Sequence, residues 1–278
     1  MQAARAYTLA GTLAGFLLIN PKSGGTGPSA DELAAAARER GVEPRILGGE
    51  DDAAALAAAA PEGPIGIAGG DGSLAPVATV ALERDLPFVV VPFGTRNHFA
   101  RDLGLDRDDP FAALEAFSGT EQRIDVARAD DRLFLNNISF GVYASLVHRR
   151  EHHRRRRAAF ARARALLRTL RHPHRLRLVV DGDTIAARVI LVANNAYQLR
   201  LFDLGERTSL REGRLHLYSA GGVLPTTWDE RSSERFTIEA QSRVRAALDG
   251  EPAEFSPPIE LTIEPQALRV LLPPRSES

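Results

Sequence analysis

Apolar and polar positions up to about residue 120 form a repeating pattern of short apolar runs and longer, alanine-rich segments. The apolar runs are typical of buried strands, because they are brief and are followed by glycine, proline or polar residues. We predict strands at residues 15–20, 43–48, 65–68 and 88–92.

The segments between these runs carry helix signals. Ser29 and Glu32 have the spacing of a capping box, and Ser73 is placed to cap the helix that follows it. We predict helices after Ser29, over residues 51–60, over residues 74–84, and between Pro110 and Gly119. Regular alternation of strands and helices with short connections predicts a doubly wound parallel α/β domain.

From about residue 122 the pattern changes to short segments in which apolar and polar residues alternate. Such alternation is typical of antiparallel strands with one buried face. Asp181-Gly182 and Asp249-Gly250 separate these segments and have the sequence of tight hairpin turns. One basic helix is predicted over residues 157–171. The second half is therefore predicted to be mostly antiparallel β structure, with a domain boundary between residues 120 and 128.

The composition excludes several kinds of partner and site. The 278 residues include no cysteine, which excludes disulfides and thiolate metal sites and agrees with a reducing compartment. The formal net charge is −1, so no global field attracts nucleic acid, and we expect no nucleic-acid partner. The apolar stretch at the start of the chain does not reach the roughly 18 uninterrupted apolar residues that a spanning helix requires. We therefore expect a cytoplasmic protein.

Three polar loops that contain glycine follow predicted strands. They are "NPKSGGTG" (20–27), "GGDGS" (69–73) and "PFGTRNHFAR" (92–101). Ligands of open parallel sheets bind outside the carboxyl ends of the strands, and glycine allows a ligand to approach backbone N–H groups. A following helix N-terminus favours phosphate. The loops therefore predict a nucleotide site, although the chain contains neither a P-loop sequence nor a GxGxxG fingerprint.

The segments "NPKSGG", "GGDGS" and "PFGTRNHFARDLGL", in this order and at this spacing, resemble the catalytic domain of the diacylglycerol kinase and sphingosine kinase superfamily. The likeness is strongest to soluble bacterial lipid kinases of the diacylglycerol kinase type, and it continues in residues 123–141 and 249–252. It implies an N-terminal nucleotide-binding α/β domain at residues 14–124. It also implies a C-terminal antiparallel β-sandwich at residues 125–272, whose last strand can return to the first domain.

The resemblance implies phosphoryl transfer to a lipid hydroxyl, with ATP and Mg²⁺ as cofactors and a diacylglycerol-like lipid as the expected acceptor. Asp71 matches the family aspartate that acts at the metal or the acceptor, so it is a predicted catalytic residue and metal ligand. From the residues alone, Asp71 can also be an Asx-type turn former. The positions that match the family's nucleotide-binding loops are Asn20, Lys22, Gly24, Gly25, Gly69, Gly70, Gly72, Ser73, Thr95 and Asn97.

Two acidic residues of the second half correspond to family positions. Glu251 corresponds to the acidic residue of its DGE element, a candidate general base. From the residues alone, Asp249-Gly250 is only a hairpin turn, and "DGD" at 181–183 looks almost the same. Glu212-Gly213 is the counterpart of a family aspartate-glycine pair that supports a structural magnesium, and it departs from that pair by having glutamate. Glu212 is therefore a second predicted metal ligand at a site that the departure puts in question.

Some positions depart from the family pattern. His98 stands where the bacterial lipid kinases usually have an aspartate, and imidazole is a poor replacement for a carboxylate on magnesium. Ala75 and Pro76 stand where asparagine and glutamate are frequent. These departures leave open a nucleotide-binding, membrane-associated regulator without catalysis. An NAD kinase shares the GGDG loop and is a further alternative, although it looks different at residues 92–105.

The segment 148–171 is rich in arginine. Its "HRREH" sequence (148–152) fits a zinc pattern, but the surrounding positive charge opposes a bound Zn²⁺. The same charge attracts anionic lipid headgroups. We therefore expect this segment to bind an anionic membrane surface transiently, which would place the protein at the inner face of the membrane. A homodimer is also considered.

Overall fold

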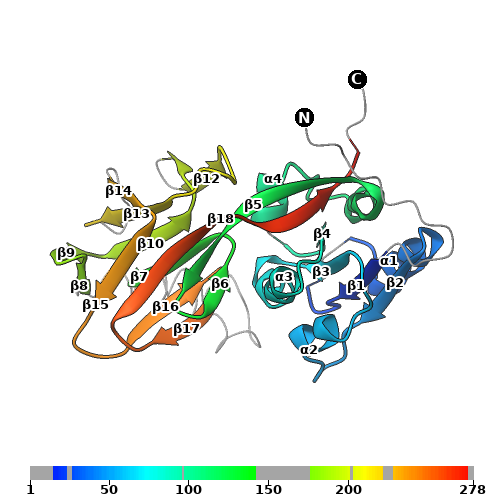
Figure 1. The fold of residues 1–278 in the computed structure, drawn as a ribbon, viewed down its shortest axis with the longest axis horizontal. Coiled ribbons are helices and arrows are strands. Elements are labelled where there is room, and N and C mark those ends of the chain that lie inside the picture. The colour runs from blue at the N-terminus through cyan, green and yellow to red at the C-terminus, as the bar shows by residue number, and fades with distance from the viewer. Residues whose placement is uncertain are drawn as a thin grey trace, which may run out of the picture. The chain divides into compact units, whose positions relative to one another are not determined.

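The structure is a computed structural model that describes residues 15–23, 27–95, 97–141, 176–200, 203–221 and 228–274. Gly24, Gly25 and the basic segment 148–171, with its "HRREH" sequence, lie outside these residues. The described chain forms two compact units, which are traced in Figure 1. The first contains residues up to Asp125 together with residues from Gln266 onward, and the second contains residues 126–265.

Four parallel strands form the centre of the first unit (Figure 1). They are β1 (Gly15–Ile19), β2 (Val42–Ile46), β3 (Ile65–Gly69) and β4 (Phe88–Pro92), in the order β2-β1-β3-β4. β1, β3 and β4 are buried along their whole length, as strands covered on both faces are. β2 alternates in exposure and contains Pro44, which suits a strand at the edge of the sheet.

Helices connect these strands. They are α1 (Ala30–Glu39), α2 (Ala53–Ala58), α3 (Leu74–Glu83), α4 (His98–Asp102) and α5 (Pro110–Ala113), with 3-10 turns η1 (Asp71–Ser73) and η2 (Leu114–Ser118). The predicted capping box of α1 is confirmed, because the Ser29 N–H donates to Glu32 Oε2 at 2.7 Å and the Glu32 N–H to Ser29 Oγ at 3.2 Å. The single helix predicted to end at Gly119 is instead α5 followed by η2.

Two long strands, β5 (Thr120–Ala129) and β18 (Ile259–Leu272), run through both units. In the first unit, β18 pairs in parallel with β4 at Val270 and Phe88. In the second unit, the beginning of β18 pairs antiparallel with β15 (Arg235–Glu239). The buried carboxylate of Asp125 accepts the N–H of Gln266 at 2.7 Å, which ties β5 to β18 within the first unit.

The second unit contains antiparallel sheets (Figure 1). Its six-stranded sheet has the order β14-β13-β10-β7-β16-β17. These strands are β7 (Asn137–Gly141), β10 (Val189–Asn194), β13 (Leu215–Ala220), β14 (Asp229–Ser233), β16 (Val244–Leu248) and β17 (Glu251–Phe255). Facing it are β15, β8 (Leu176–Val180), β9 (Asp183–Ala187), part of β18, and β6 (Arg132–Phe134), which pairs with β5. β11 (Tyr197–Arg200) and β12 (Asp203–Arg207) form a separate pair.

Alternate residues of the two facing sheets share one core in the second unit. Ile138 and Phe140 of β7 pack in the same apolar cluster as Leu178 of β8 and Phe236 of β15, and all four side chains are buried. The predicted hairpin turns are confirmed, because β8 and β9 are joined at 181–182 and β16 and β17 at 249–250, with positive φ at all four positions. The predicted fold class, a parallel α/β domain combined with an antiparallel β-sandwich, is therefore confirmed.

In the described part of the chain, no helix is both long and apolar enough to span a bilayer.

Candidate functional site

The loops that follow β1, β3 and β4 lie next to one another at the carboxyl edge of the parallel sheet. Their strands are neighbours in the sheet order, so their ends meet at the same edge. The Asn20 N–H donates to the Ala68 carbonyl at 2.9 Å, and the Phe93 N–H donates to the Gly69 carbonyl at 3.2 Å. The structure therefore brings together the three loops that the sequence singled out, as far as their residues are described.

The loops after β3 and β4 touch at two glycines. A Cβ atom added to Gly94 would lie 2.5 Å from the Cα of Gly70 and 2.8 Å from Asn97 Oδ1. No side chain fits between the two backbones at this distance, so glycine at 94 is required by the close approach rather than by its own φ.

Replacing Gly94 by alanine tests this contact. We expect the two loops to be forced apart, with a loss of about 1–3 kcal/mol of stability from overpacking and a loss of ligand binding at the loops. Thermal unfolding and calorimetric titration with ATP measure the two effects. Gly221→Ala is the control, because a Cβ at Gly221 meets nothing within 4 Å and Gly221 lies in the second unit, outside the three loops. Equal behaviour of the two variants would contradict the inferred contact.

Asn97 shapes the loop after β4. It has a φ of 48° in the left-handed region, and its side chain is buried. Its Oδ1 accepts the Gly94 N–H at 3.0 Å, and its Nδ2 donates to the Gly94 carbonyl at 2.9 Å. The side chain that was predicted to bind the nucleotide therefore holds its own loop and fixes the backbone around Gly94.

Asp71 binds the loop after β4 through its carboxylate. Oδ2 accepts the His98 N–H at 3.1 Å and Oδ1 accepts the Phe99 N–H at 2.9 Å. These two N–H groups begin α4, whose own N-cap residue Asn97 makes no side-chain cap. Asp71 therefore caps a helix 27 residues further along the chain, a role that neither the metal-ligand prediction nor the Asx-turn interpretation contains.

Ser73 does not cap α3 with its hydroxyl, and that prediction is wrong. It occupies the N-cap position, but its Oγ donates to the Gly70 carbonyl at 2.7 Å instead of accepting an N–H from the helix. A Cβ on Gly69 would lie 2.0 Å from this Oγ, so Gly69 provides the space for the serine. The first turn of α3 consequently has no cap from its own N-cap side chain.

Of the remaining loop residues, Lys22 and Thr95 are exposed and Gly72 is half-buried. The Lys22 ammonium donates to the Gly49 carbonyl at 3.3 Å. Asn20 Oδ1 accepts the Lys22 N–H at 3.1 Å and so closes the turn after β1. These side chains are placed at the sheet edge on which phosphate binding was predicted.

A magnesium site made by protein side chains alone does not fit the described residues. Both oxygens of Asp71 accept backbone N–H groups. Among the residues that the structure describes, no group of three or more His, Asp or Glu side chains could hold a metal ion. Mg²⁺ is often bound by one or two carboxylates together with substrate phosphates. Any Mg²⁺ here would therefore enter as part of a bound nucleotide.

Glu212, the second predicted metal ligand, is engaged by the protein. Its Oε1 lies 2.9 Å from His216 Nε2, and its Oε2 accepts the Ala196 N–H at 3.1 Å. The other ring nitrogen of His216 lies 2.9 Å from Glu230 Oε1. The donor set around Glu212 thus does not fit a magnesium site.

Tyr218 lies beside this cluster. Burial raises the pKa of the Tyr218 phenol, and the carboxylates of Glu230 and Glu212 raise it further, although the N–H of Tyr197 donates to the oxygen at 3.1 Å. Near neutral pH this phenol is therefore not a proton acceptor.

Glu251 begins β17 directly after the Asp249-Gly250 turn, and its side chain is exposed. The turn itself is partly buried, because the carboxylate of Asp249 accepts backbone N–H groups of residues 135–137. Glu251 is thus presented from a tightly bound turn. Its predicted role as general base stays a prediction.

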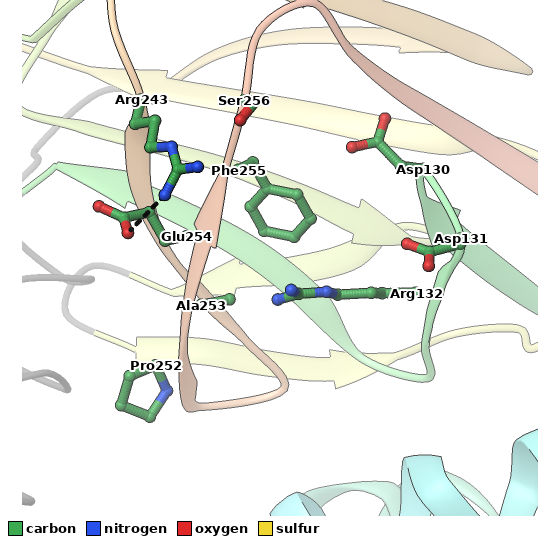
Figure 2. Close-up of a pocket in the computed structure, with 9 residues that line it drawn as sticks. All are labelled: Asp130, Asp131, Arg132, Arg243, Pro252, Ala253, Glu254, Phe255 and Ser256. Carbon is green, nitrogen blue, oxygen red and sulfur yellow. Dashed lines mark ion pairs between the residues drawn. The ribbon is translucent and has the colours of Figure 1, made fainter.

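A surface hollow of about 630 Å³ lies along the rest of β17. In Figure 2, Arg132 extends past the ring of Phe255, with its guanidinium carbon 5.0 Å from the ring centroid, and Arg243 pairs with Glu254 at 3.8 Å. Asp130 and Asp131 also line it. Three carboxylates therefore accompany two guanidinium groups, and this mixture does not select an anionic or a cationic ligand.

Several buried polar residues near the Asp249 turn were not singled out from the sequence. Asn136, Asn194, Asn195 and Arg207 are all buried in the second unit. The asparagine pairs follow apolar runs, which is the one signal that the sequence offers. Arginine in an exposed-looking strand pattern gives no sign of burial, so Arg207 could not be found in this way.

Comparisons with known proteins show which proteins this chain resembles. Residues 14–129 match the family model of the diacylglycerol kinase catalytic domain. A protein of Klebsiella pneumoniae (strain 342) named "Probable lipid kinase YegS-like" is 28% identical over 229 residues, which cover 74% of this chain and 76% of that protein. A diacylglycerol kinase of Mycobacterium tuberculosis (strain ATCC 25618 / H37Rv) is 32% identical over 182 residues, or 59% of this chain and 58% of that protein.

The fold also has a solved counterpart. The crystal structure of a diacylglycerol kinase from Bacillus anthracis str. Sterne superposes with a TM-score of 0.67, at 15% identity, and covers 95% of this chain and 98% of that chain. At this identity the likeness concerns the fold alone. The family match by itself confirms the expected resemblance, which for residues 14–129 is to the diacylglycerol kinase catalytic domain.

Proposed function

We propose that this protein is a lipid kinase that transfers the γ-phosphoryl group of ATP to a lipid hydroxyl, with a diacylglycerol-like lipid as acceptor. The observation that carries the proposal is the meeting of three loops at one sheet edge, with the Asp71 carboxylate joining two of them. This arrangement lies in the segment that matches the diacylglycerol kinase catalytic domain. The names of the relatives support the same class of acceptor.

Phosphoryl transfer depends mainly on positioning and on neutralising charge. The glycine-bearing loop at 70–72 offers backbone N–H groups to phosphate oxygens, and α3 begins directly behind it. Lys22 would leave the Gly49 carbonyl to neutralise phosphate charge. Mg²⁺, bound to ATP, would balance charge on the phosphates. Asp71 acts by holding α4 and the loop before it in place.

The lipid hydroxyl oxygen forms the new bond to the γ-phosphorus, and the bond from that phosphorus to the β–γ bridging oxygen breaks as ADP leaves. The hydroxyl proton must pass to a base, and we propose the Glu251 carboxylate for this step. The exposed position of Glu251 at the start of β17 supports this choice.

Transfer of label from [γ-³²P]ATP by the full chain tests the function. Separate reactions contain diacylglycerol, a sphingoid base, a total lipid extract or NAD, and products are identified by chromatography and mass spectrometry. We expect a labelled lipid, with diacylglycerol the best of the defined acceptors. Label in NADP would instead identify an NAD kinase. ATP binding in calorimetry without any labelled lipid would identify the regulator that His98 and Pro76 leave open.

A further inference from the structure

In three hairpin turns of the second unit, an aspartate binds the backbone of a neighbouring strand in the same way. Each of these turns has an aspartate with positive φ, and each aspartate exchanges two hydrogen bonds with one residue of a neighbouring strand. Its N–H donates to that residue's carbonyl, and its carboxylate accepts that residue's N–H. The pairs are Asp130 with Glu260, Asp181 with Thr237, and Asp249 with Asn137.

Asp249 goes beyond this shared pattern. Its Oδ2 also accepts the Leu135 N–H at 2.8 Å, and its Oδ1 also accepts the Asn136 N–H at 2.8 Å. Asp249 is 8% exposed, whereas Asp130 and Asp181 are exposed. A buried carboxylate that accepts several backbone N–H groups is a strong, charge-assisted contact. Asp249 therefore does more than close its own hairpin.

The opposite side of the same backbone is bound by a buried cation. The Leu135 carbonyl accepts from Arg207 Nη1 at 2.6 Å and from Asn194 Nδ2 at 3.1 Å. This carbonyl and the Asn136 N–H belong to one peptide group, the 135–136 peptide. A buried carboxylate thus lies at its N–H end and a buried guanidinium at its C=O end. Both charges agree with the direction of the peptide dipole, and in a poorly solvated site such contacts are strengthened.

Residues 135–137 are consequently held at every backbone polar group. The Asn136 carbonyl accepts the Asn194 N–H at 3.0 Å, and the Asn137 carbonyl accepts the Asp249 N–H at 2.9 Å. Arg207 Nη2 also donates to Asn136 Oδ1 at 2.9 Å. This small loop is therefore a rigid support for whatever it contacts, and it contacts the turn that leads into Glu251.

We propose that Asp249 and Arg207 are positioning residues for Glu251, and that they act together through the 135–136 peptide. The inference rests on the proposed function in so far as Glu251 accepts a proton there. Only Gly250 separates Asp249 from Glu251, and among the described strands β17 pairs with β16 alone. The bound turn therefore fixes the backbone from which the Glu251 side chain extends. A general base must lie within hydrogen-bond reach of the proton that it accepts.

Asp249→Asn and Arg207→Met test the proposal, and Asp181→Asn is the matched control from a turn of the same kind. An asparagine at 249 presents an NH₂ group to N–H donors and cannot accept all three bonds. Hydrogen exchange of the full chain without ligands is the first readout. We expect the amides of residues 135–137 and of Glu251 to exchange at least about tenfold faster in both variants, with no change at these amides in Asp181→Asn. The double variant should add little to either single one.

Steady-state kinetics with a lipid acceptor are the second readout. We expect kcat to fall by about tenfold or more in Asp249→Asn because the base is misplaced, while the KM for ATP is unchanged. Arg207→Met should lower kcat in the same way. Arg207→Lys, which keeps the positive charge, should retain part of the rate that Arg207→Met loses. If Asp249 had a purely structural role, Asp249→Asn would lower thermal stability but would not lower kcat selectively at an unchanged KM for ATP.

Exchange at residues 135–137 that responds no more to Asp249→Asn than to Asp181→Asn would overturn the proposal, whether or not the protein is a kinase. Faster exchange with an unchanged kcat would overturn the link to Glu251. If the unaltered protein phosphorylates no lipid, the proposed function fails, and exchange at the Glu251 amide still decides whether the two residues position this segment. Should Asp249→Asn fail to fold, Arg207→Lys and Arg207→Met carry both readouts.

Discussion

Replacing Asp71 by asparagine is expected to lower kcat/KM for ATP in lipid phosphorylation by about 100-fold or more. Asp71 accepts the His98 and Phe99 N–H groups through different oxygens, and asparagine keeps only one of these two oxygens. Its NH₂ group would face the other N–H. The first turn of α4 and the loop at Gly94 should then move, and the loops would no longer match the phosphates. Labelled-phosphate transfer at several ATP concentrations measures the effect.

Asp109→Asn is the matched control for Asp71→Asn. Asp109 also caps a short helix of the first unit, since its Oδ1 accepts the Ala112 N–H at 2.9 Å. It lies in none of the three loops of the candidate site. We expect this variant to keep the unaltered rate. If Asp71→Asn also keeps it, Asp71 neither positions the loops nor takes part in the chemistry.

Glu251→Gln is expected to lower kcat by between about 10² and 10⁴, the range typical of a lost general base. The amide keeps the size and the hydrogen-bonding reach of the carboxylate but does not take the hydroxyl proton at neutral pH. The fold should be unaffected, because the side chain is exposed at the end of a hairpin. Binding of ATP, measured by calorimetry, should stay unchanged while turnover falls.

Glu254→Gln, on the same strand, controls for the loss of one negative charge. Glu254 is exposed and pairs at 3.8 Å with Arg243, and such surface pairs contribute about 1 kcal/mol or less. Its replacement should leave kcat nearly unchanged. A similar small effect of Glu251→Gln would show that the proton leaves by another route, and the role of Glu251 would have to be given up.

Local sequence pattern was sufficient for much of the fold. Buried parallel strands appear as unbroken apolar runs, and β1, β3 and β4 lie where these runs are. The Asp-Gly pairs gave the two hairpins, because positive φ at both positions suits few other residues. In contrast, the hydroxyl of Ser73 was expected on α3 and donates to Gly70, since a serine at a helix start has several backbone groups within reach.

The sequence by itself determined the alternation of elements, the change from parallel to antiparallel structure, and the three glycine-bearing loops, because each depends on residues close together in the chain. Only the tertiary structure decided what Asp71 and Asp249 bind. Asp71 caps a helix 27 residues away, and Asp249 accepts from Leu135 across 114 residues. The sequence of a turn does not show what its aspartate binds. The partners are the backbone N–H groups that tertiary packing buries next to the carboxylate, where water cannot bind them.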